Sequence, residues 1–297
     1  AELAAQLAAA AEQAAKALDH FCSGGQPHEE IPRVLAAMRE HCRAQELLYP
    51  LRKALPPVGL YFLEPSARPR VRAIDPDVVR GGEPPVGLVK ASSRTGERGG
   101  FSLYVPEAYD AARPWPLVVA LHGGSGTGDD FLWSWLTEAR SRGCLLMAPT
   151  SRGSTWALAG EDIDSPALRT MVEYVAEHWH VDRTHILLTG LSDGATYTLL
   201  CGLQPDTPFT HLAPVSGVLH PANLVNGNLA RAAGRRIYLV HGVLDWMFPI
   251  ALARLAHQEL EKAGAEIVFR PIDDLSHTYP REENGAILTW FDPSLAL

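Results

Sequence analysis

The chain has 297 residues, 46% of them hydrophobic and 20% charged, which is enough apolar material for a sizeable core and excludes a mainly disordered chain. It carries 26 Lys and Arg residues against 34 Asp and Glu residues, a formal net charge of −8. An acidic chain without a basic run is a poor partner for nucleic acid or for an anionic membrane. No segment approaches the roughly 20 apolar residues of a membrane-spanning helix.

The first residues lack the basic start and the small-residue cleavage site of a secretory signal. Four cysteines are too few for a disulfide scaffold in a chain of this length. Cys22 and Cys42 fall on two predicted helices and stand too far apart to pair. Cys144 and Cys201 lie in apolar runs and are predicted to be core residues. We therefore expect a reducing, cytoplasmic compartment.

Residues 1–49 show the apolar periodicity of two helices, predicted at 2–22 and 31–46. The first helix is rich in alanine, so it has little area to bury, and we expect the pair to dock on another surface. Residues 50–85 contain eight prolines, a density that excludes a long helix or a central strand there. We predict an extended connector, with one domain at 1–85 and a second at 86–297.

From residue 86 onward, short apolar runs alternate with helical stretches. Eight strands are predicted, at 86–90, 101–105, 116–121, 144–148, 185–189, 212–216, 236–241 and 266–271. Helices are predicted behind an N-cap at Ser165 and at 195–201, 251–263 and 282–290. Runs that are apolar at nearly every position are typical of strands buried on both faces of a mostly parallel sheet. The sequence therefore predicts an α/β fold that follows an N-terminal helical extension.

The segment Gly190-Leu191-Ser192-Asp193-Gly194 joins a predicted buried strand to a predicted helix. A serine on such a sharp turn has an exposed Oγ, and the flanking glycines let strand and helix approach closely. This pattern indicates a nucleophile at Ser192. The alternative is a glycine-rich turn with an ordinary serine.

A serine nucleophile needs a base and an acid that orients the base, and both are expected beyond later strands of the sheet. Asp245 follows the predicted strand 236–241, and His277 follows the strand 266–271. The alternatives are a turn-capping aspartate, a surface histidine, and Asp273 or Asp274 as the acid. We expect Ser192, Asp245 and His277 to converge at one edge of the sheet.

The glycine-rich stretch 121–126 also ends a predicted strand, and such a bend can direct main-chain N–H groups into the site. We predict an oxyanion hole formed by the N–H groups of Gly124 and Asp193, in which the Asp193 side chain matters little. A dinucleotide site is excluded because residue 129 is Asp rather than Gly. His and Cys spacings match no metal site, so neither a metal nor a cofactor is expected.

These motifs resemble the α/β-hydrolase superfamily, and within it the carboxylesterase/phospholipase and dienelactone-hydrolase-like esterases. The resemblance rests on L-H-G-G-S-G at 121–126, S-R-G-S-T-W at 151–156, L-T-G-L-S-D-G at 188–194, H-G-V-L-D at 241–245 and S-H at 276–277. It implies an eight-stranded sheet with helices on both faces and Ser192, Asp245 and His277 as a catalytic triad. Residues 217–235 are too few for the helical lid of many lipases, which argues against lipase activity on long triglycerides.

Five large apolar residues accompany these motifs and are predicted to line a substrate pocket: Trp156, Leu191, Trp246, Met247 and Phe248. Trp133 and Trp135 either join that pocket or pack in the core. The N-terminal helices are expected to dock over the mouth of the pocket or on a second subunit, which would make a homo-oligomer.

The sequence predicts a serine esterase that hydrolyses short- to medium-acyl carboxylic esters through an acyl-enzyme, with activity falling below about pH 6.5 as the histidine protonates. A thioesterase, a lysophospholipase or a small-peptide hydrolase would use the same triad. A non-catalytic ligand-binding protein on a hydrolase scaffold is the alternative from another class.

Overall fold

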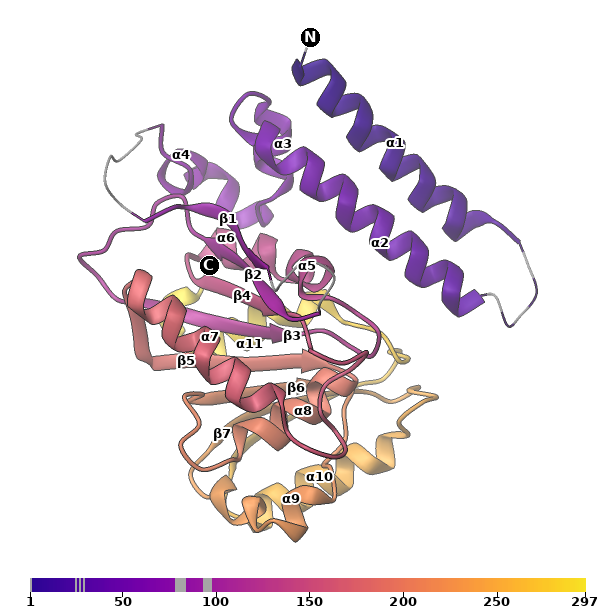
Figure 1. Ribbon diagram of the computed structural model, residues 1–297, viewed down its shortest axis with the longest axis vertical. Helices are drawn as coiled ribbons and strands as arrows, with labels where there is room; N and C mark the ends of the chain where they lie inside the picture. The colour runs from indigo at the N-terminus through magenta and orange to yellow at the C-terminus, as the bar shows by residue number, and fades with distance from the viewer. Residues whose placement is uncertain (1, 25, 27, 29, 78–83, 93–97) are drawn as a thin grey trace. The chain divides into compact units, whose positions relative to one another are not determined.

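The computed structural model describes residues 2–297 except residues 25, 27, 29, 78–83 and 93–97. The chain forms two compact units, Ala1–Ala73 and Ile74–Leu297, whose elements are labelled in Figure 1. The predicted division near residue 85 stays a prediction, since it falls beside residues outside the described part of the chain.

The first unit begins with the two predicted helices, α1 (Glu2–Cys22) and α2 (Glu30–Leu48). The residues buried on them are mostly small: Ala10, Ala17, Ala37, Ala44 and Gln45. The Gln6 side chain on α1 also donates a hydrogen bond to the Leu47 carbonyl on α2, at 3.0 Å. Small side chains allow the two helix backbones to pack closely.

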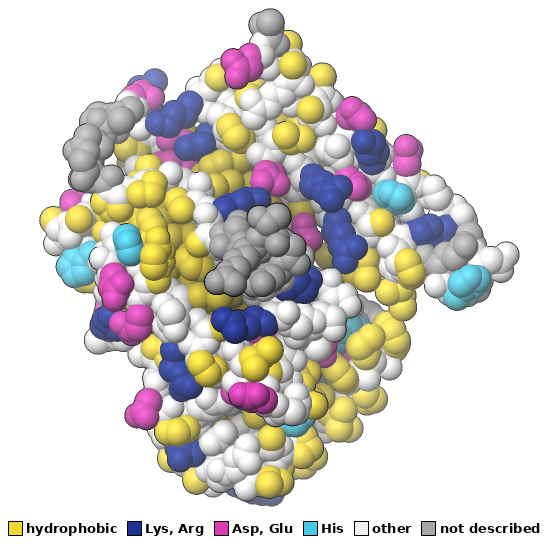
Figure 2. All heavy atoms as spheres, in the orientation of Figure 1, with side chains coloured by type: hydrophobic (Ala, Val, Ile, Leu, Met, Phe, Trp, Pro, Cys, Tyr) yellow, Lys and Arg dark blue, Asp and Glu magenta, His cyan; other side chains and the backbone are white. Residues whose placement is uncertain are grey.

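The large apolar side chains of this helical pair do not form its buried seam. Leu18 and Phe21 on α1 are 63% and 69% exposed, and Ile31 and Met38 on α2 are also exposed. Apolar and charged side chains are both scattered over the face of these helices that Figure 2 shows. The expectation that a second subunit or the mouth of the site covers this surface stays a prediction.

The proline-rich segment folds into short helices, which corrects the expectation of an extended connector. They are η2 (Tyr49–Arg52), α3 (Pro56–Tyr61), η3 (Pro65–Arg70) and α4 (Val71–Ile74). The first three carry a proline at the first or second helical position. Proline is tolerated there because its missing N–H would have no partner within the helix. Its density therefore excludes long helices without excluding short ones.

The second unit is built on an eight-stranded sheet in the order β1-β2-β4-β3-β5-β6-β7-β8. The strands are β1 (Gly87–Ser92), β2 (Gly100–Val105), β3 (Trp115–Leu121), β4 (Leu145–Pro149), β5 (Val181–Leu191), β6 (His211–Val215), β7 (Arg236–Gly242) and β8 (Glu266–Ile272). β2 runs antiparallel to both of its neighbours, and all other pairs are parallel. This confirms the predicted mostly parallel sheet, and each predicted strand is present.

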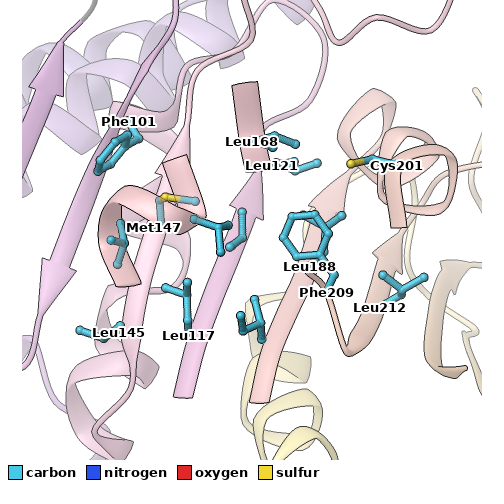
Figure 3. Close-up of a cluster of buried hydrophobic side chains, with 14 of the residues drawn as sticks. Phe101, Leu117, Leu121, Leu145, Met147, Leu168, Leu188, Cys201, Phe209 and Leu212 are labelled. Atoms are coloured by element: carbon cyan, nitrogen blue, oxygen red, sulfur yellow. The ribbon is translucent and has the colours of Figure 1, made fainter. Parts of the chain in front are cut away.

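Helices cover both faces of this sheet, as expected. The longer ones are α6 (Leu136–Arg142), α7 (Asp164–His178), α8 (Asp193–Gly202), α10 (Ile250–Lys262) and α11 (Asn284–Phe291), with short helical turns α5 (Gly128–Phe131) and α9 (Ala222–Val225). Leu117 and Leu121 of β3 share one buried cluster with Leu168 of α7 and Cys201 of α8 (Figure 3). α11 packs on the opposite face, where the Phe291 ring meets that of His211 at 5.0 Å.

Several helix boundaries differ from the predicted ones. α7 begins at Asp164, so Ser165 lies inside its first turn and is not the N-cap; its Oγ instead lies 2.7 Å from the Tyr197 hydroxyl. α6 was not predicted, because its apolar positions are few. Cys144 and Cys201 are buried, as predicted. Among the described helices, none combines the length and apolar character needed to cross a bilayer.

Candidate active site

Ser192 lies at the junction of β5 and α8 in a strained backbone conformation, with φ of 56° and ψ of −116°. Positive φ is costly for a residue with a Cβ and persists only where the surroundings enforce it. Here the glycines two residues before and after Ser192 allow the close packing that surrounds the turn. A Cβ on Gly190 would stand 2.5 Å from the carbonyl carbon of Gly194, and one on Gly194 would stand 2.5 Å from the His122 carbonyl oxygen. Strand and helix therefore approach to a distance that only glycine permits.

The three side chains expected to converge do so at the carboxyl edge of the sheet. Ser192 Oγ lies 3.0 Å from Nε2 of His277, and Nδ1 of His277 lies 2.8 Å from Oδ2 of Asp245. Asp245 follows β7 and His277 follows β8, and parallel strands bring both to the edge where β5 ends. The Asp245 side chain is fully buried, whereas the His277 side chain is 11% exposed. The arrangement is a continuous hydrogen-bonded chain from hydroxyl to carboxylate.

The Asp245 carboxylate uses its two oxygens for different partners. Oδ1 accepts hydrogen bonds from the N–H groups of Met247, at 3.0 Å, and Phe248, at 2.8 Å. Asp245 is therefore a turn-capping residue and a partner of His277 at once, and the two interpretations of the sequence are compatible. The rival acids Asp273 and Asp274 are exposed in the loop after β8.

His122 holds the glycine-rich loop after β3. Its Nδ1 lies 2.6 Å from the Gly123 carbonyl oxygen, and its Nε2 accepts a hydrogen bond from the Ser151 N–H at 3.1 Å. These contacts require a neutral ring that carries its proton on Nδ1. Burial lowers the pKa of His122 to about 4, so the ring stays neutral near pH 7 and the loop keeps both hydrogen bonds.

The two residues predicted to supply oxyanion donors lie side by side. Asp193 is the first residue of α8, where main-chain N–H groups have no partner within the helix. A Cβ on Gly124 would stand 2.8 Å from Oδ2 of Asp193. The loop after β3 and the start of α8 thus meet beside Ser192.

Four of the five predicted pocket residues lie near the site. Trp246 and Met247 are 62% and 44% exposed on the loop after β7. The Trp246 ring centre is 6.3 Å from that of His277, and the Phe248 ring meets His277 edge-on at 5.4 Å. Leu191 is half-buried, and its Cδ2 would lie 3.8 Å from a Cβ on Gly123.

Trp156 does not line an open pocket, which corrects the fifth assignment. Its side chain is 2% exposed and belongs to the main core cluster. The indole N–H donates a hydrogen bond to the His122 carbonyl at 2.8 Å, and the ring stacks on Tyr197 at 5.5 Å. Trp156 thus supports the loop after β3 from inside the protein. Trp133 and Trp135 are buried as well, in agreement with core packing.

Comparison with known proteins relates the part of the chain from α7 to α11 to a known family. Residues 162–293 match the model of the phospholipase/carboxylesterase family. A probable feruloyl esterase C of Aspergillus niger is 29% identical over 161 residues, which are 50% of this chain and 56% of that protein. The chain thus spans little more than half the length of that curated relative.

Two solved structures share the fold at low sequence identity. The acetyl xylan esterase from Aspergillus awamori has a TM-score of 0.55 and 17% identity, covering 69% of this chain and 98% of that one. The S-formylglutathione hydrolase from Agrobacterium tumefaciens has a TM-score of 0.55 and 17% identity, covering 70% and 95%. The chain has the α/β-hydrolase fold. The resemblance drawn from the sequence motifs is therefore confirmed.

Two polar residues of this α/β-hydrolase site were not predicted from the sequence, although both lie in the quoted motifs. Thr155 of S-R-G-S-T-W donates a hydrogen bond from Oγ1 to Asp193 Oδ2 at 2.6 Å. His241 of H-G-V-L-D lies with Nε2 2.7 Å from the Phe248 carbonyl oxygen and 3.5 Å from Asp245 Oδ2. Their position in these motifs was the sequence signal that could have indicated a role at the site. Within the described residues, no group of three or more His, Cys, Asp and Glu side chains could hold a metal ion.

Proposed function

We propose that this protein is a serine esterase that cleaves carboxylic esters through an acyl-enzyme. The observation that supports it is the hydrogen-bonded chain from Ser192 Oγ through His277 to Asp245, at 3.0 and 2.8 Å, on a serine with positive φ. A serine hydroxyl near neutral pH needs a base within hydrogen-bonding reach, and that base needs an acid to orient it.

In the first half of the reaction, Ser192 Oγ attacks the ester carbonyl carbon while His277 Nε2 accepts the hydroxyl proton. Asp245 orients the imidazole through Nδ1 and stabilises its cationic form. The oxyanion of the tetrahedral intermediate accepts hydrogen bonds from the N–H groups of Gly124 and Asp193. His277 then gives its proton to the leaving alkoxide, and the acyl group remains on Ser192.

In the second half, water attacks the acyl-enzyme. His277 accepts a proton from this water, and the same donors hold the second oxyanion. The proton returns to Ser192 Oγ as the carboxylic acid leaves. These steps use the side chains and main-chain N–H groups named above together with one water molecule.

The apolar side chains beside His277 support the proposed substrate class. Trp246 and Met247 are exposed next to the proposed base, so a short- to medium-length acyl group or an aromatic group can bury apolar surface there. Hydroxycinnamoyl esters are the second candidate substrate, because feruloyl esterases are the curated relatives and the exposed indole of Trp246 offers an aromatic ring a partner.

The test of the proposed function is the fate of Ser192. A fluorophosphonate should label the protein at Ser192, as located by mass spectrometry, and the protein should hydrolyse aryl esters of short acids. Ser192→Ala should lose several orders of magnitude in kcat without a change in melting temperature. Comparable rates from Ser192→Ala would reject the assignment, and absence of an adduct would favour a non-catalytic binding protein.

A substrate panel separates the activities that share this triad. Aryl acetates, aryl butyrates, methyl ferulate, an acyl-thioester, a lysophospholipid and a dipeptide anilide would be compared by kcat/KM. We expect the oxygen esters to lead. A thioester, lysophospholipid or anilide that exceeds them at least tenfold would replace the esterase assignment with the corresponding activity.

A further inference from the structure

The side chain of Asp193 packs directly against Gly124, although the two residues come from different segments. A Cβ on Gly124 would stand 2.8 Å from Asp193 Oδ2, 3.6 Å from its carboxyl carbon and 3.9 Å from Oγ1 of Thr155. The carboxylate therefore occupies the space that a larger residue at 124 would need. The expectation that the Asp193 side chain matters little does not account for this contact.

A hydrogen bond holds that carboxylate in place. Thr155 Oγ1 donates to Asp193 Oδ2 at 2.6 Å, in a partly buried position. Hydrogen bonds from hydroxyl groups to carboxylates are short and stronger than those between neutral groups. The bond connects the segment 151–156, which follows β4, to the first turn of α8.

The segment 151–156 is itself bound to the loop after β3. The Ser151 N–H donates to His122 Nε2 at 3.1 Å, the Ser125 N–H donates to the Ser154 carbonyl at 2.9 Å, and the Trp156 indole donates to the His122 carbonyl at 2.8 Å. The loop after β3, the segment 151–156 and the Ser192 turn therefore meet around one carboxylate. The Thr155–Asp193 bond closes this set of contacts.

The charge of Asp193 cannot stabilise an oxyanion, because two negative charges repel each other. Donors assist an oxyanion when they are held in position before it forms. A carboxylate in the first turn of a helix also interacts favourably with the helix dipole, which is a purely structural role. The structural role affects stability alone, whereas a geometric role at the donors affects kcat.

We propose that Asp193 and Thr155 are positioning residues that set the separation between the N–H groups of Gly124 and Asp193. The proposal rests on the proposed esterase function, since it concerns the donors of the same intermediate. The contribution is geometric and does not come from the charge. An asparagine at position 193 keeps an acceptor oxygen for Thr155 and removes the charge, so it separates the two effects.

The test compares Asp193→Ala, Asp193→Asn, Thr155→Val, Thr155→Ser and the double variant Asp193→Ala/Thr155→Val in the full chain, with an aryl acetate as substrate. We expect Asp193→Ala and Thr155→Val to lower kcat about 10- to 100-fold with little change in KM. The double variant should be no worse than the poorer single variant, because both remove one contact. Asp193→Asn should keep or exceed the wild-type kcat, and Thr155→Ser should restore it.

Thr170→Val is the matched control, since Thr170 is exposed on α7 and its Oγ1 donates a hydrogen bond to the Pro166 carbonyl of the same helix. If Asp193→Ala and Thr155→Val keep kcat within about twofold of the wild type, the positioning role is rejected while the esterase function stands. If the kcat losses of the two single variants multiply in the double variant, the two residues act independently and the positioning role is rejected. It is also rejected if Asp193→Asn does not retain kcat. If Asp193→Ala does not fold, the kcat values of Thr155→Val and Asp193→Asn test the positioning role in its place.

Failure of the proposed function itself has a different signature. A wild-type protein that neither hydrolyses any ester of the panel nor reacts with a fluorophosphonate at Ser192 has no oxyanion to bind, and both proposals are then rejected. If Asp193→Ala lowers the melting temperature and leaves kcat unchanged, Asp193 contributes to the stability of α8 alone.

Discussion

Nε2 of His241 lies 3.5 Å from Oδ2 of Asp245, the same oxygen that Nδ1 of His277 approaches at 2.8 Å. The side chains of His241 and Asp245 are both fully buried. His241 Nε2 is also 2.7 Å from the Phe248 carbonyl oxygen, so its ring connects the end of β7 to the loop that carries Asp245. The proposed acid is thus held between two imidazoles and two main-chain N–H groups.

The first prediction concerns the acid. Asp245→Asn should lower kcat by roughly 10³- to 10⁴-fold, because an amide does not stabilise the His277 cation and favours the wrong ring tautomer. Esterase kinetics and fluorophosphonate labelling rates would measure the loss. Asp273→Asn and Asp274→Asn are the matched controls, since both residues are exposed after β8. A larger loss of kcat in either control would assign the role of the acid to that residue.

The second prediction concerns His241. His241→Phe removes the donor to the Phe248 carbonyl and should cost about 1–3 kcal/mol in the free energy of unfolding. It should also lower kcat, because the Asp245 loop loses a support. His241→Gln can present an N–H at a similar reach and should recover most of both losses. Equal kinetics for Phe and Gln variants would show that His241 acts only through its volume.

The third prediction concerns a buried ion pair. The Arg140 side chain is fully buried and lies 2.9 Å from Asp75 and 3.4 Å from Glu107. Arg140→Met leaves two buried carboxylates without this cation and should cost about 3–5 kcal/mol in urea unfolding. Arg183→Met is the control, because Arg183 and Glu173 are 56% and 50% exposed, and it should cost less than about 1 kcal/mol. Similar costs would contradict the prediction.

The fourth prediction is a loss of stability in mild acid. Burial lowers the pKa of both His122 and His211 to about 4, and the Arg236 charge adds to the effect on His211. In the unfolded chain these histidines bind protons below about pH 6.5. Between about pH 6.5 and 4 the unfolded state therefore holds more protons than the folded state, and stability falls as the pH falls, by up to about 3 kcal/mol for His122.

Urea unfolding at pH 7, 6 and 5 would measure this dependence. His211→Gln keeps an acceptor for the Arg236 guanidinium, which lies 2.7 Å from His211 Nε2. The substitution removes one titrating group. The fall in the free energy of unfolding with falling pH should therefore become shallower by at most about 1.4 kcal/mol per pH unit. An unchanged slope in this variant would show that His211 does not contribute.

Several features of the fold could be predicted from local sequence. The eight strands were predictable because each contains a short apolar run; the run 116–121 is apolar at nearly every position, and β3 is buried along its whole length. The turn at Ser192 was predictable because its conformation needs glycine at 190 and 194. The short helices at 49–74 were not, since proline excludes a long helix but permits a helical start.

The sequence by itself determined the strands, the strained turn and the order in which Ser192, Asp245 and His277 follow their strands, because each depends on local apolar pattern or local steric demand. Only the tertiary structure decided that Trp156 lies in the core, that Thr155 bonds Asp193 and that His241 lies against Asp245. The Trp156 and Thr155 contacts join segments far apart in the chain, whereas His241 and Asp245 are four residues apart and meet through the way the loop after β7 folds against its strand. Their geometry depends on how strands and helices pack, and no local pattern carries that information.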